Sequence, residues 1–514
     1  MRKNTTIQIL HTSDIHGYIF PTSYTTKQPE NLGLGKLSTL INNLRNDNTL
    51  LIDTGDTIQG SPFTYYHSKE HGVEVNPIAK IFNKMNYDYV SIGNHEFNYG
   101  KDYLLNYLSN LDATILNSNI LDKNTNNPFI GVTHDITKID NYTIGIIGVT
   151  THYIPNWEQP SHIKDLLILD AFETTKKQVA LLREKVDFLI VNYHGGFERD
   201  FDTNNLTVVD TGENQGSKML KEIDGIDLLL TGHQHRLLNG SNTGTIYSQP
   251  GYNGQLLSQI VIELSENNSP QVLTNQLLDL INVKPDEKVL EIAHVLEESA
   301  QVFLDTPVGK MDHDMLITNQ LDARIHKHPL VSLINHIQLE FTDADISLCG
   351  LGNNVSGFRK DITIRDVIGT YIYPNTLVVK KLSGTVIKQA LEKTAEFFDI
   401  GNNEIIISDT FNTPKLQLYA YDMYDGIDYT MKISNPIGNR ITSLTKDGKN
   451  LDLNKDYSVV MNNYRSAGGG DYTFIKDCET INDTQKEVIE LLIDYILETK
   501  NIVIPHKNNI KVIK

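Results

Sequence analysis

The first half of the chain alternates short apolar runs with longer amphipathic stretches. The stretch 37–44 repeats leucine and isoleucine with the spacing of one helix face. The apolar runs have the length and composition of buried strands, and they are Ile7–Leu10, Leu50–Ile52, Tyr89–Ile92, Ile144–Val149, Phe188–Val191 and Leu228–Leu230. This alternation predicts a layered α/β domain, in which reactive groups gather on loops at the carboxyl ends of strands.

The second half has a different pattern. A long helix is predicted over Lys284–Leu304, and a second helix-like segment surrounds Leu330–Leu339. The residues that follow mix strands and helices and are numerous enough for a core of their own, whereas single cores rarely exceed ~250–300 residues. We therefore predict a boundary near Leu316, with domains of 1–315 and 316–514.

The charge of the chain excludes some partners. Its 514 residues carry a formal net charge of −19. Nucleic-acid polymers and anionic membranes attract basic faces, so we expect neither as a partner. A phosphate-bearing substrate would need metal ions or local Arg and Lys to attract it. The oligomeric state is left open.

The termini and cysteines bear on location. The N-terminal MRKNTTIQIL lacks the apolar region of a signal peptide, and no apolar run is long enough to span a membrane. Cys349 and Cys478 are expected to be free thiols, which suit a reducing cytoplasm. A chain trimmed of a leader would look the same, so a secreted or periplasmic location stays open.

Five short polar segments stand where predicted strands should open into loops. Their imidazoles, carboxylates and one amide suit Mn²⁺, Fe, Co²⁺, Zn²⁺ or Ni²⁺, and the absence of thiolates argues against a structural zinc site. One such segment alone would often be a turn or a core histidine. Five together are best explained by one site for two ions about 3.5–4 Å apart. The segments read HTSDIHG from His11, DTGD from Asp53, GNHE from Gly93, NYHGG from Asn192 and TGHQH from Thr231.

The spacing within these segments suggests how they act. Asp14 and His16 would point to one face of an extended segment, and His233 and His235 repeat that spacing. Asp56 is the candidate bridge between the ions, because it is central in the set. The candidate ligands are Asp14, His16, Asp56, Asn94, His194, His233 and His235.

Four neighbouring residues have other expected roles. His11 is expected to be a bystander. Asp53 is expected to shape its loop or to hydrogen-bond a ligand. His152 and His162 lie outside the motifs and are expected to be ordinary surface or core residues.

At these motifs the chain resembles the calcineurin-like metallophosphoesterases, and over nearly its whole length it is similar to the two-domain 5′-nucleotidase family. The resemblance implies a four-layer α/β/β/α metal domain followed by a smaller mixed α/β substrate-binding domain. It also implies that His95 is the catalytic histidine beside the metals. One ion would be held by Asp14, His16, Asp56 and His235, and the other by Asp56, Asn94, His194 and His233.

One departure from the family pattern points to a branch. The third motif of 5′-nucleotidases continues GNHEFD, whereas this chain reads GNHEFNYG, with Asn98 in place of the aspartate. An amide can orient an imidazole but cannot stabilise an imidazolium as a carboxylate does. The GNHEFNYG form is similar to the branch that hydrolyses 2′,3′-cyclic nucleotides and 3′-nucleotides.

The second half carries the expected substrate contacts. YIYPNTL from Tyr371 and NNYRSAGGGDY from Asn462 resemble C-terminal segments of that branch. The resemblance implies that Tyr421 and Tyr464 sandwich the nucleobase, with Tyr424 as the alternative to Tyr421. Stacking a base on an aromatic ring is worth ~1–3 kcal/mol.

A second departure lies early in the predicted C-terminal domain. Where 5′-nucleotidases carry a GG-x-R signature, this chain reads GLGNNVSGFR, with Asn353 and Asn354 in the loop and Arg359 several residues later. Asn354 is a candidate substrate contact, although the contacts to ribose or phosphate are in doubt.

The chemistry expected from these features is metal-assisted hydrolysis of a nucleotide phosphoester. No Ser or Cys nucleophile motif is evident, so no covalent intermediate is expected. The leading prediction is a 2′,3′-cyclic-nucleotide 2′-phosphodiesterase with 3′-nucleotidase activity. The alternatives are a 5′-nucleotidase or nucleotide-sugar pyrophosphatase, a catalytically silent nucleotide-binding protein, and a metal-dependent nuclease, which the acidic balance disfavours.

Overall fold

A computed structural model describes the chain except for residues 1, 157, 202, 207–210, 267, 372, 374, 413–415 and 505–507. Ile372 and Pro374 of the YIYPNTL segment therefore lie outside the described residues. The chain divides into two compact units, Met1–Ala300 and Gln301–Lys514. The domain boundary near Leu316 stays a prediction.

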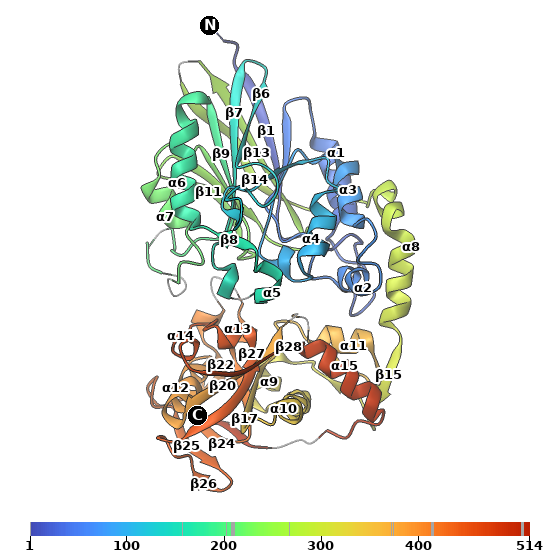
Figure 1. Cartoon of the computed structure of the whole chain (residues 1–514), viewed down its shortest axis with the longest axis vertical. Coiled ribbons are helices and arrows are strands. Elements are labelled where there is room, and N and C mark those ends of the chain that lie inside the picture. The colour runs from blue at the N-terminus through green and yellow to red at the C-terminus, as the bar shows by residue number, and fades with distance from the viewer. Residues whose placement is uncertain are drawn as a thin grey trace. The chain divides into compact units, whose positions relative to one another are not determined.

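The first unit is built on two six-stranded sheets (Figure 1). In order across the first sheet, the strands are β14 (Asn268–Asp279), β13 (Leu256–Ser265), β1 (Thr5–Thr12), β2 (Thr49–Asp53), β3 (Tyr89–Ser91) and β4 (Thr114–Leu116). In the second sheet they are β11 (Leu237–Asn242), β12 (Thr245–Pro250), β10 (Leu228–Thr231), β9 (Phe188–His194), β7 (Tyr142–Thr150) and β6 (His134–Ile139). The strands that precede the polar segments run parallel within each sheet, so their carboxyl ends meet at one edge of it.

Strand alternation explains the layers of this unit. Ile190 of β9 packs between the two sheets together with Ile9 of β1, whereas its neighbours Leu189 and Val191 pack under the helices. The helices on that side are α6 (Ala171–Leu182) and α7 (Gly216–Glu222), and α1 (Leu34–Leu44), α3 (Pro77–Met85) and α4 (Lys101–Leu108) cover the other sheet (Figure 1). The α/β/β/α prediction is confirmed, and all six predicted strands are present.

The second unit mixes strands and helices, as predicted. The strands of its five-stranded sheet are, in order, β23 (Asp422–Asp425), β17 (Ile346–Gly350), β27 (Asp456–Asn462), β20 (Thr376–Ser383) and β28 (Thr480–Glu487). A four-stranded sheet contains β26 (Lys449–Asn450), β25 (Ile441–Lys446), β24 (Asp428–Lys432) and β29 (Ile510–Ile513). The main helices are α10 (Pro329–Thr342), α12 (Gly384–Ala395) and α15 (Val488–Thr499). The helix predicted over Lys284–Leu304 is α8 (Glu287–Leu304), which leads from the first unit into the second.

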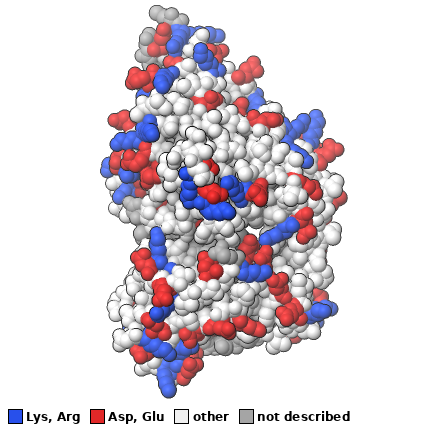
Figure 2. Space-filling model, in the orientation of Figure 1, with Lys and Arg blue, Asp and Glu red and all other residues white. Residues whose placement is uncertain are grey.

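The distribution of charged side chains and the state of the two cysteines leave the expectations about partners and location unchanged. On the face that Figure 2 shows, Lys and Arg side chains are interspersed with Asp and Glu. Cys349 and Cys478 are both free thiols, and the cytoplasmic location stays a prediction. Among the described residues, no helix has the length and apolar character needed to cross a membrane.

Candidate metal centre

The five polar segments meet at the carboxyl ends of strands β1, β2, β3, β9 and β10. Two groups of potential metal ligands form there: Asp14, His16 and His235 in one, and Asp56, His194 and His233 in the other. Within each group the ligand atoms lie within 4.8 Å of one another. Asn94 joins the second group, since its Oδ1 is 2.8 Å from His233 Nδ1 and 3.1 Å from His194 Nε2.

The backbone at these ligands differs from the extended geometry that the spacing suggested. Asp14 and His16 lie beyond the end of β1 and have left-handed backbone, with φ of 54° and 51°. Asp56, His233 and His235 are also left-handed, with φ between 56° and 68°. Such conformations cost about 1–3 kcal/mol each in a non-glycine residue and persist only where the surroundings impose them. The extended-strand argument was therefore wrong, although the two pairs do converge.

Hydrogen bonds between the loops impose this backbone. The Asp14 N–H donates to Gly55 O and the His16 N–H donates to Asp56 O, each at 2.9 Å. The backbone N–H of His233 donates to Asp14 Oδ1 at 3.0 Å. A side chain at Gly93 would collide with Asp56 Oδ1, so only glycine permits this approach of the two loops.

The first group presents two imidazole nitrogens to each other. His16 Nδ1 lies 2.8 Å from Gln59 O, which can only accept, so Nδ1 carries the proton and Nε2 has a free lone pair. His16 Nε2 lies 3.0 Å from His235 Nε2, and the latter is 3.4 Å from Asp14 Oδ1. The ring of His95 lies beside this group, 5.3 Å from the ring of His16.

The second group brings acceptors together in the same way. His194 Nδ1 lies 3.0 Å from Thr54 O, so its Nε2 lone pair points to Asp56 Oδ2 at 3.1 Å. Asp56 Oδ2 is buried and has no hydrogen bond of acceptable geometry among the described residues, while Asp56 Oδ1 accepts from the His95 N–H at 2.7 Å. Buried polar atoms rarely remain without partners, so these converging acceptors fit divalent cations.

In the centre, the ionised carboxylates and the protonated histidine stabilise one another's charge. Burial lowers the pKa of His194, but the carboxylates of Asp56 and Asp14 outweigh this effect and raise it to about 9. Burial opposes ionisation of Asp14, yet its contact with His235 and the nearby His194 lower its pKa to about 2. Burial also opposes ionisation of Asp56, whose pKa His194 and His95 hold well below its ordinary value.

Two carboxylates that the sequence did not single out support the ligands. Glu96 is buried and accepts backbone N–H bonds from Asp56, Thr57 and Gly93 at 2.5–2.8 Å, which fixes the loop that carries Asp56. Glu213 Oε1 lies 2.7 Å from His233 Nε2, so Nε2 carries the proton and Nδ1, which bears the lone pair, faces Asn94 Oδ1 in the centre. Glu96 stands inside a motif and could have been found, whereas no local signal marks Glu213.

His95 stands at the start of a hydrogen-bond chain. Its Nδ1 lies 2.6 Å from Asn98 Oδ1, and Asn98 Nδ2 donates to Glu158 Oε2 at 2.7 Å. His162 Nδ1 lies 2.8 Å from Glu158 Oε1. His162, expected to be an ordinary surface or core residue, is a partly exposed side chain that pairs with Glu158 four residues earlier. His11 is buried against Thr54, 2.6 Å from its hydroxyl, in keeping with a bystander.

The predicted substrate residues of the second unit have different surroundings. Tyr421 has no exposed surface and packs against Phe397 and Phe398, so its prediction as a stacking ring was wrong. Tyr424, the alternative, is equally buried. Tyr421 directly precedes β23, and Tyr424 lies within that strand, all of whose residues are buried.

The half-exposed aromatic residues lie nearby. Tyr464 has its ring 6.5 Å from that of Tyr419, and Tyr419 is 6.2 Å from Tyr373. Tyr419 and Tyr373 were missed because tyrosines are frequent in this stretch of sequence. Asn354 is exposed at a turn, and its neighbour Asn353 binds the backbone of Leu416 and Leu418.

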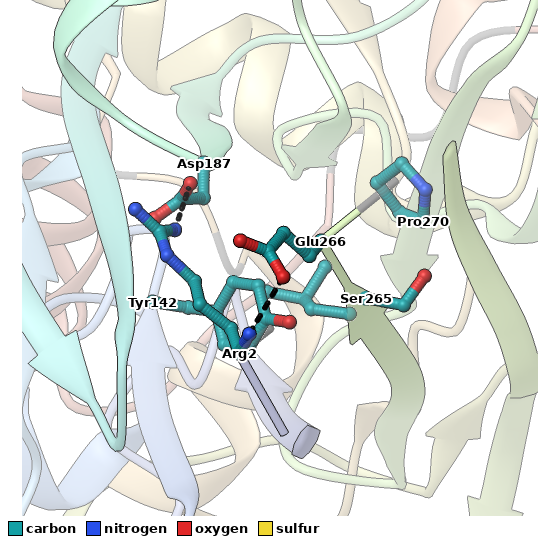
Figure 3. A pocket seen from close by; sticks show the side chains of 7 residues that line it. Arg2, Tyr142, Asp187, Ser265, Glu266 and Pro270 are labelled. Carbon is teal, nitrogen blue, oxygen red and sulfur yellow. Dashed lines mark hydrogen bonds and ion pairs between the residues drawn. The ribbon is translucent and has the colours of Figure 1, made fainter. Parts of the chain in front are cut away.

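A separate cavity lies near the amino ends of β1 and β9, whereas the metal centre lies at their carboxyl ends (Figure 3). Arg2 precedes β1 and Asp187 precedes β9, and their side chains form an ion pair of 2.6 Å. The Arg2 N–H donates to Glu266 at 2.7 Å. These charged groups satisfy one another at the amino ends of the strands, so this cavity has no part in the metal centre.

Family models match both halves of the chain. The calcineurin-like phosphoesterase model matches residues 7–237, and the 5′-nucleotidase C-terminal domain model matches residues 307–477. A Staphylococcus aureus protein assigned as a 5′-nucleotidase has a solved structure that is similar at a TM-score of 0.92 and 36% identity, over 99% of this chain and 100% of that one.

Curated relatives are more distant. A 2′,3′-cyclic-nucleotide 2′-phosphodiesterase/3′-nucleotidase of Salmonella typhimurium is 29% identical over 90% of this chain and 81% of its own length. The trifunctional nucleotide phosphoesterase protein of Bacillus subtilis is 25% identical over 96% of this chain, which spans only 38% of that protein. The 5′-nucleotidase of Bos taurus is 23% identical over 96% of this chain and 88% of its own length.

Proposed function

The chain belongs to the calcineurin-like phosphoesterases that carry a 5′-nucleotidase C-terminal domain, and on that premise we propose that it hydrolyses nucleotide phosphoesters, foremost 2′,3′-cyclic nucleotides and 3′-nucleotides. The observation that carries the proposal is the convergence of buried acceptors around Asp56 Oδ2, which has no hydrogen-bond partner among the described residues. Hydrolysis of phosphoester bonds is the chemistry of this family, and the choice of nucleotide is the finer inference.

The donor set fits two divalent cations. Asp14, His16, Asp56 and His235 would hold one, and Asp56, Asn94, His194 and His233 the other, with Asp56 as the bridge. When bound, two such ions polarise the phosphoryl oxygens as Lewis acids and activate water as the nucleophile. Oxygen and imidazole donors suit Mn²⁺, Fe, Co²⁺ or Zn²⁺, and the native metal is left to experiment.

The remaining residues would handle the substrate. His95 lies beside His16 and would contact the phosphoryl group or protonate the leaving oxygen through Nε2, since its Nδ1 faces Asn98. Asn98 at this position supports the cyclic and 3′ branch, as does the Salmonella typhimurium relative.

The base would stack in the second unit. Tyr464 is half-exposed there, with Tyr419 beside it, and these rings could receive a nucleobase whereas the buried Tyr421 could not. The rings of Tyr419 and Tyr464 are 76° apart, so the base would rest on one of them rather than between two parallel faces. Asn354 is exposed and remains a candidate contact.

A substrate panel tests the proposal. Turnover of 2′,3′-cyclic AMP, 3′-AMP and 5′-AMP should be compared with defined divalent metals, and we expect the first two to be preferred. A clear preference for 5′-AMP would instead support a 5′-nucleotidase, which the C-terminal domain model also allows. Binding of nucleotides without turnover at any metal would support a silent binding protein.

A further inference from the structure

Glu158 is a buried carboxylate two side-chain contacts away from the centre. Its side chain accepts from Asn98 Nδ2 at 2.7 Å, from His162 Nδ1 at 2.8 Å and from the Gln159 N–H at 2.7 Å. The residue is 8% exposed. It contacts neither His95 nor any candidate metal ligand among the described residues, so any effect on the reaction must pass through Asn98.

Glu158 determines which groups donate and which accept in this series of hydrogen bonds. An amide is nearly symmetric in shape, so its neighbours decide which end carries the oxygen. A carboxylate only accepts hydrogen bonds, which turns the NH₂ group of Asn98 toward Glu158 and its oxygen toward His95. That oxygen also only accepts, so His95 must carry a proton on Nδ1. Nε2 is then the atom that faces the reaction.

We propose that Glu158 is a positioning residue that acts through Asn98 to fix the orientation and the Nδ1 proton of His95. The inference rests on the proposed function, because His95 meets substrate only there. Position 98 carries an amide where 5′-nucleotidases carry a carboxylate. In this protein Glu158 supplies a carboxylate one side chain further from His95. His162 and the Gln159 N–H hold Glu158 in place from its other oxygen.

Two single substitutions at position 158 distinguish the effect of hydrogen-bond direction from the effect of side-chain shape. Glu158→Gln keeps the shape but adds a donor, so Asn98 can turn over and present its NH₂ group to His95. Glu158→Asp is shorter but still only accepts. We expect kcat to fall about 10-fold in E158Q, a part of the ~100- to 10,000-fold that acid–base catalysis supplies. KM and metal content should stay within about 2-fold, and E158D should retain more of kcat than E158Q.

A double substitution tests the path through Asn98. Asn98→Asp alone sets two carboxylates against each other and should lower kcat. In N98D/E158Q the amide introduced at position 158 can donate to the new carboxylate, so kcat should exceed that of either single variant. Glu297→Gln is the matched control, because Glu297 is also 8% exposed and accepts from the Tyr24 hydroxyl at 2.8 Å.

The outcomes distinguish this inference from the proposed function. If the wild-type protein hydrolyses no nucleotide with any divalent metal, the function is wrong. If the wild type is active but the double variant shows the product of the two single effects, Glu158 does not act through Asn98. Wild-type kcat in E158Q, or a better kcat in E158Q than in E158D, would also overturn the inference.

Discussion

Replacing Glu213 by Gln should weaken metal binding without disturbing the fold. Glu213 Oε1 lies 2.7 Å from His233 Nε2, and the other nitrogen of that ring faces Asn94 Oδ1 at 2.8 Å. The carboxylate thus selects the tautomer in which Nε2 carries the proton and Nδ1 bears the lone pair that could bind a cation. Outer-shell partners of this kind are typically worth roughly 10- to 100-fold in metal affinity.

The exposure of Glu213 places the expected effect at the low end of that range. A hydrogen bond to a charged group contributes about 1.5–3 kcal/mol, but the Glu213 side chain is 31% exposed, so solvent screens part of it. We expect a loss of about 1.4 kcal/mol, or about 10-fold in affinity for one ion.

Competition with a chelator of known affinity measures this effect. Glu74→Gln is the matched control, since Glu74 lies 2.8 Å from His71 in the same unit but away from the centre. An E213Q protein that binds both ions as tightly as the wild type would refute the assignment of Glu213 as a support of His233.

Other substitutions probe the loops, the rings and a buried carboxyl group. Gly93→Ala should lower metal content and turnover together, because its methyl group would displace Asp56 Oδ1; unchanged metal content would contradict this. Tyr464→Ala should raise KM about 10-fold through lost stacking and leave the melting temperature nearly unchanged. Tyr421→Ala should instead lower the free energy of unfolding by about 3–5 kcal/mol, because it removes a buried ring. If kinetics and thermal melts showed the reverse pattern, the roles of the two tyrosines would be exchanged. Burial raises the pKa of Asp53 to about 7, so the stability from its bound proton is present below about pH 4 and is lost as pH rises through about 7. Urea unfolding across pH should show this decline in the wild type, by up to about 4 kcal/mol, and not in Asp53→Asn.

The sequence predicted candidate ligands well where they directly follow predicted strands. Apolar runs predicted the strands, and the parallel order of β2 and β3 in the first sheet and of β9 and β10 in the second brings their polar segments to one edge of each sheet. The backbone at Asp14 and His16 could not be read in this way, because spacing of two fits both an extended segment and a left-handed loop. Only the hydrogen bonds between loops decide between these conformations.

Long-range contacts account for what was missed. Glu213 and Glu158 come from segments without a motif, and tertiary packing alone brings them to His233 and Asn98. Tyr421 and its alternative Tyr424 were predicted, and Tyr419 was missed, because the sequence does not say which ring of a tyrosine-rich stretch faces the core. A shift of two residues separates the buried ring from the half-exposed one.

Metal content and turnover of a single preparation test the central claim most directly. The wild-type protein should bind about two divalent ions per chain, and Asp56→Asn should lose both metal and nucleotide hydrolysis, since it removes the bridging carboxylate. Removal of metal by chelation should abolish turnover, and re-addition of a divalent ion should restore it. Nucleotide hydrolysis that persists in the chelated protein, or in D56N at the wild-type rate, would contradict a dinuclear centre at these residues.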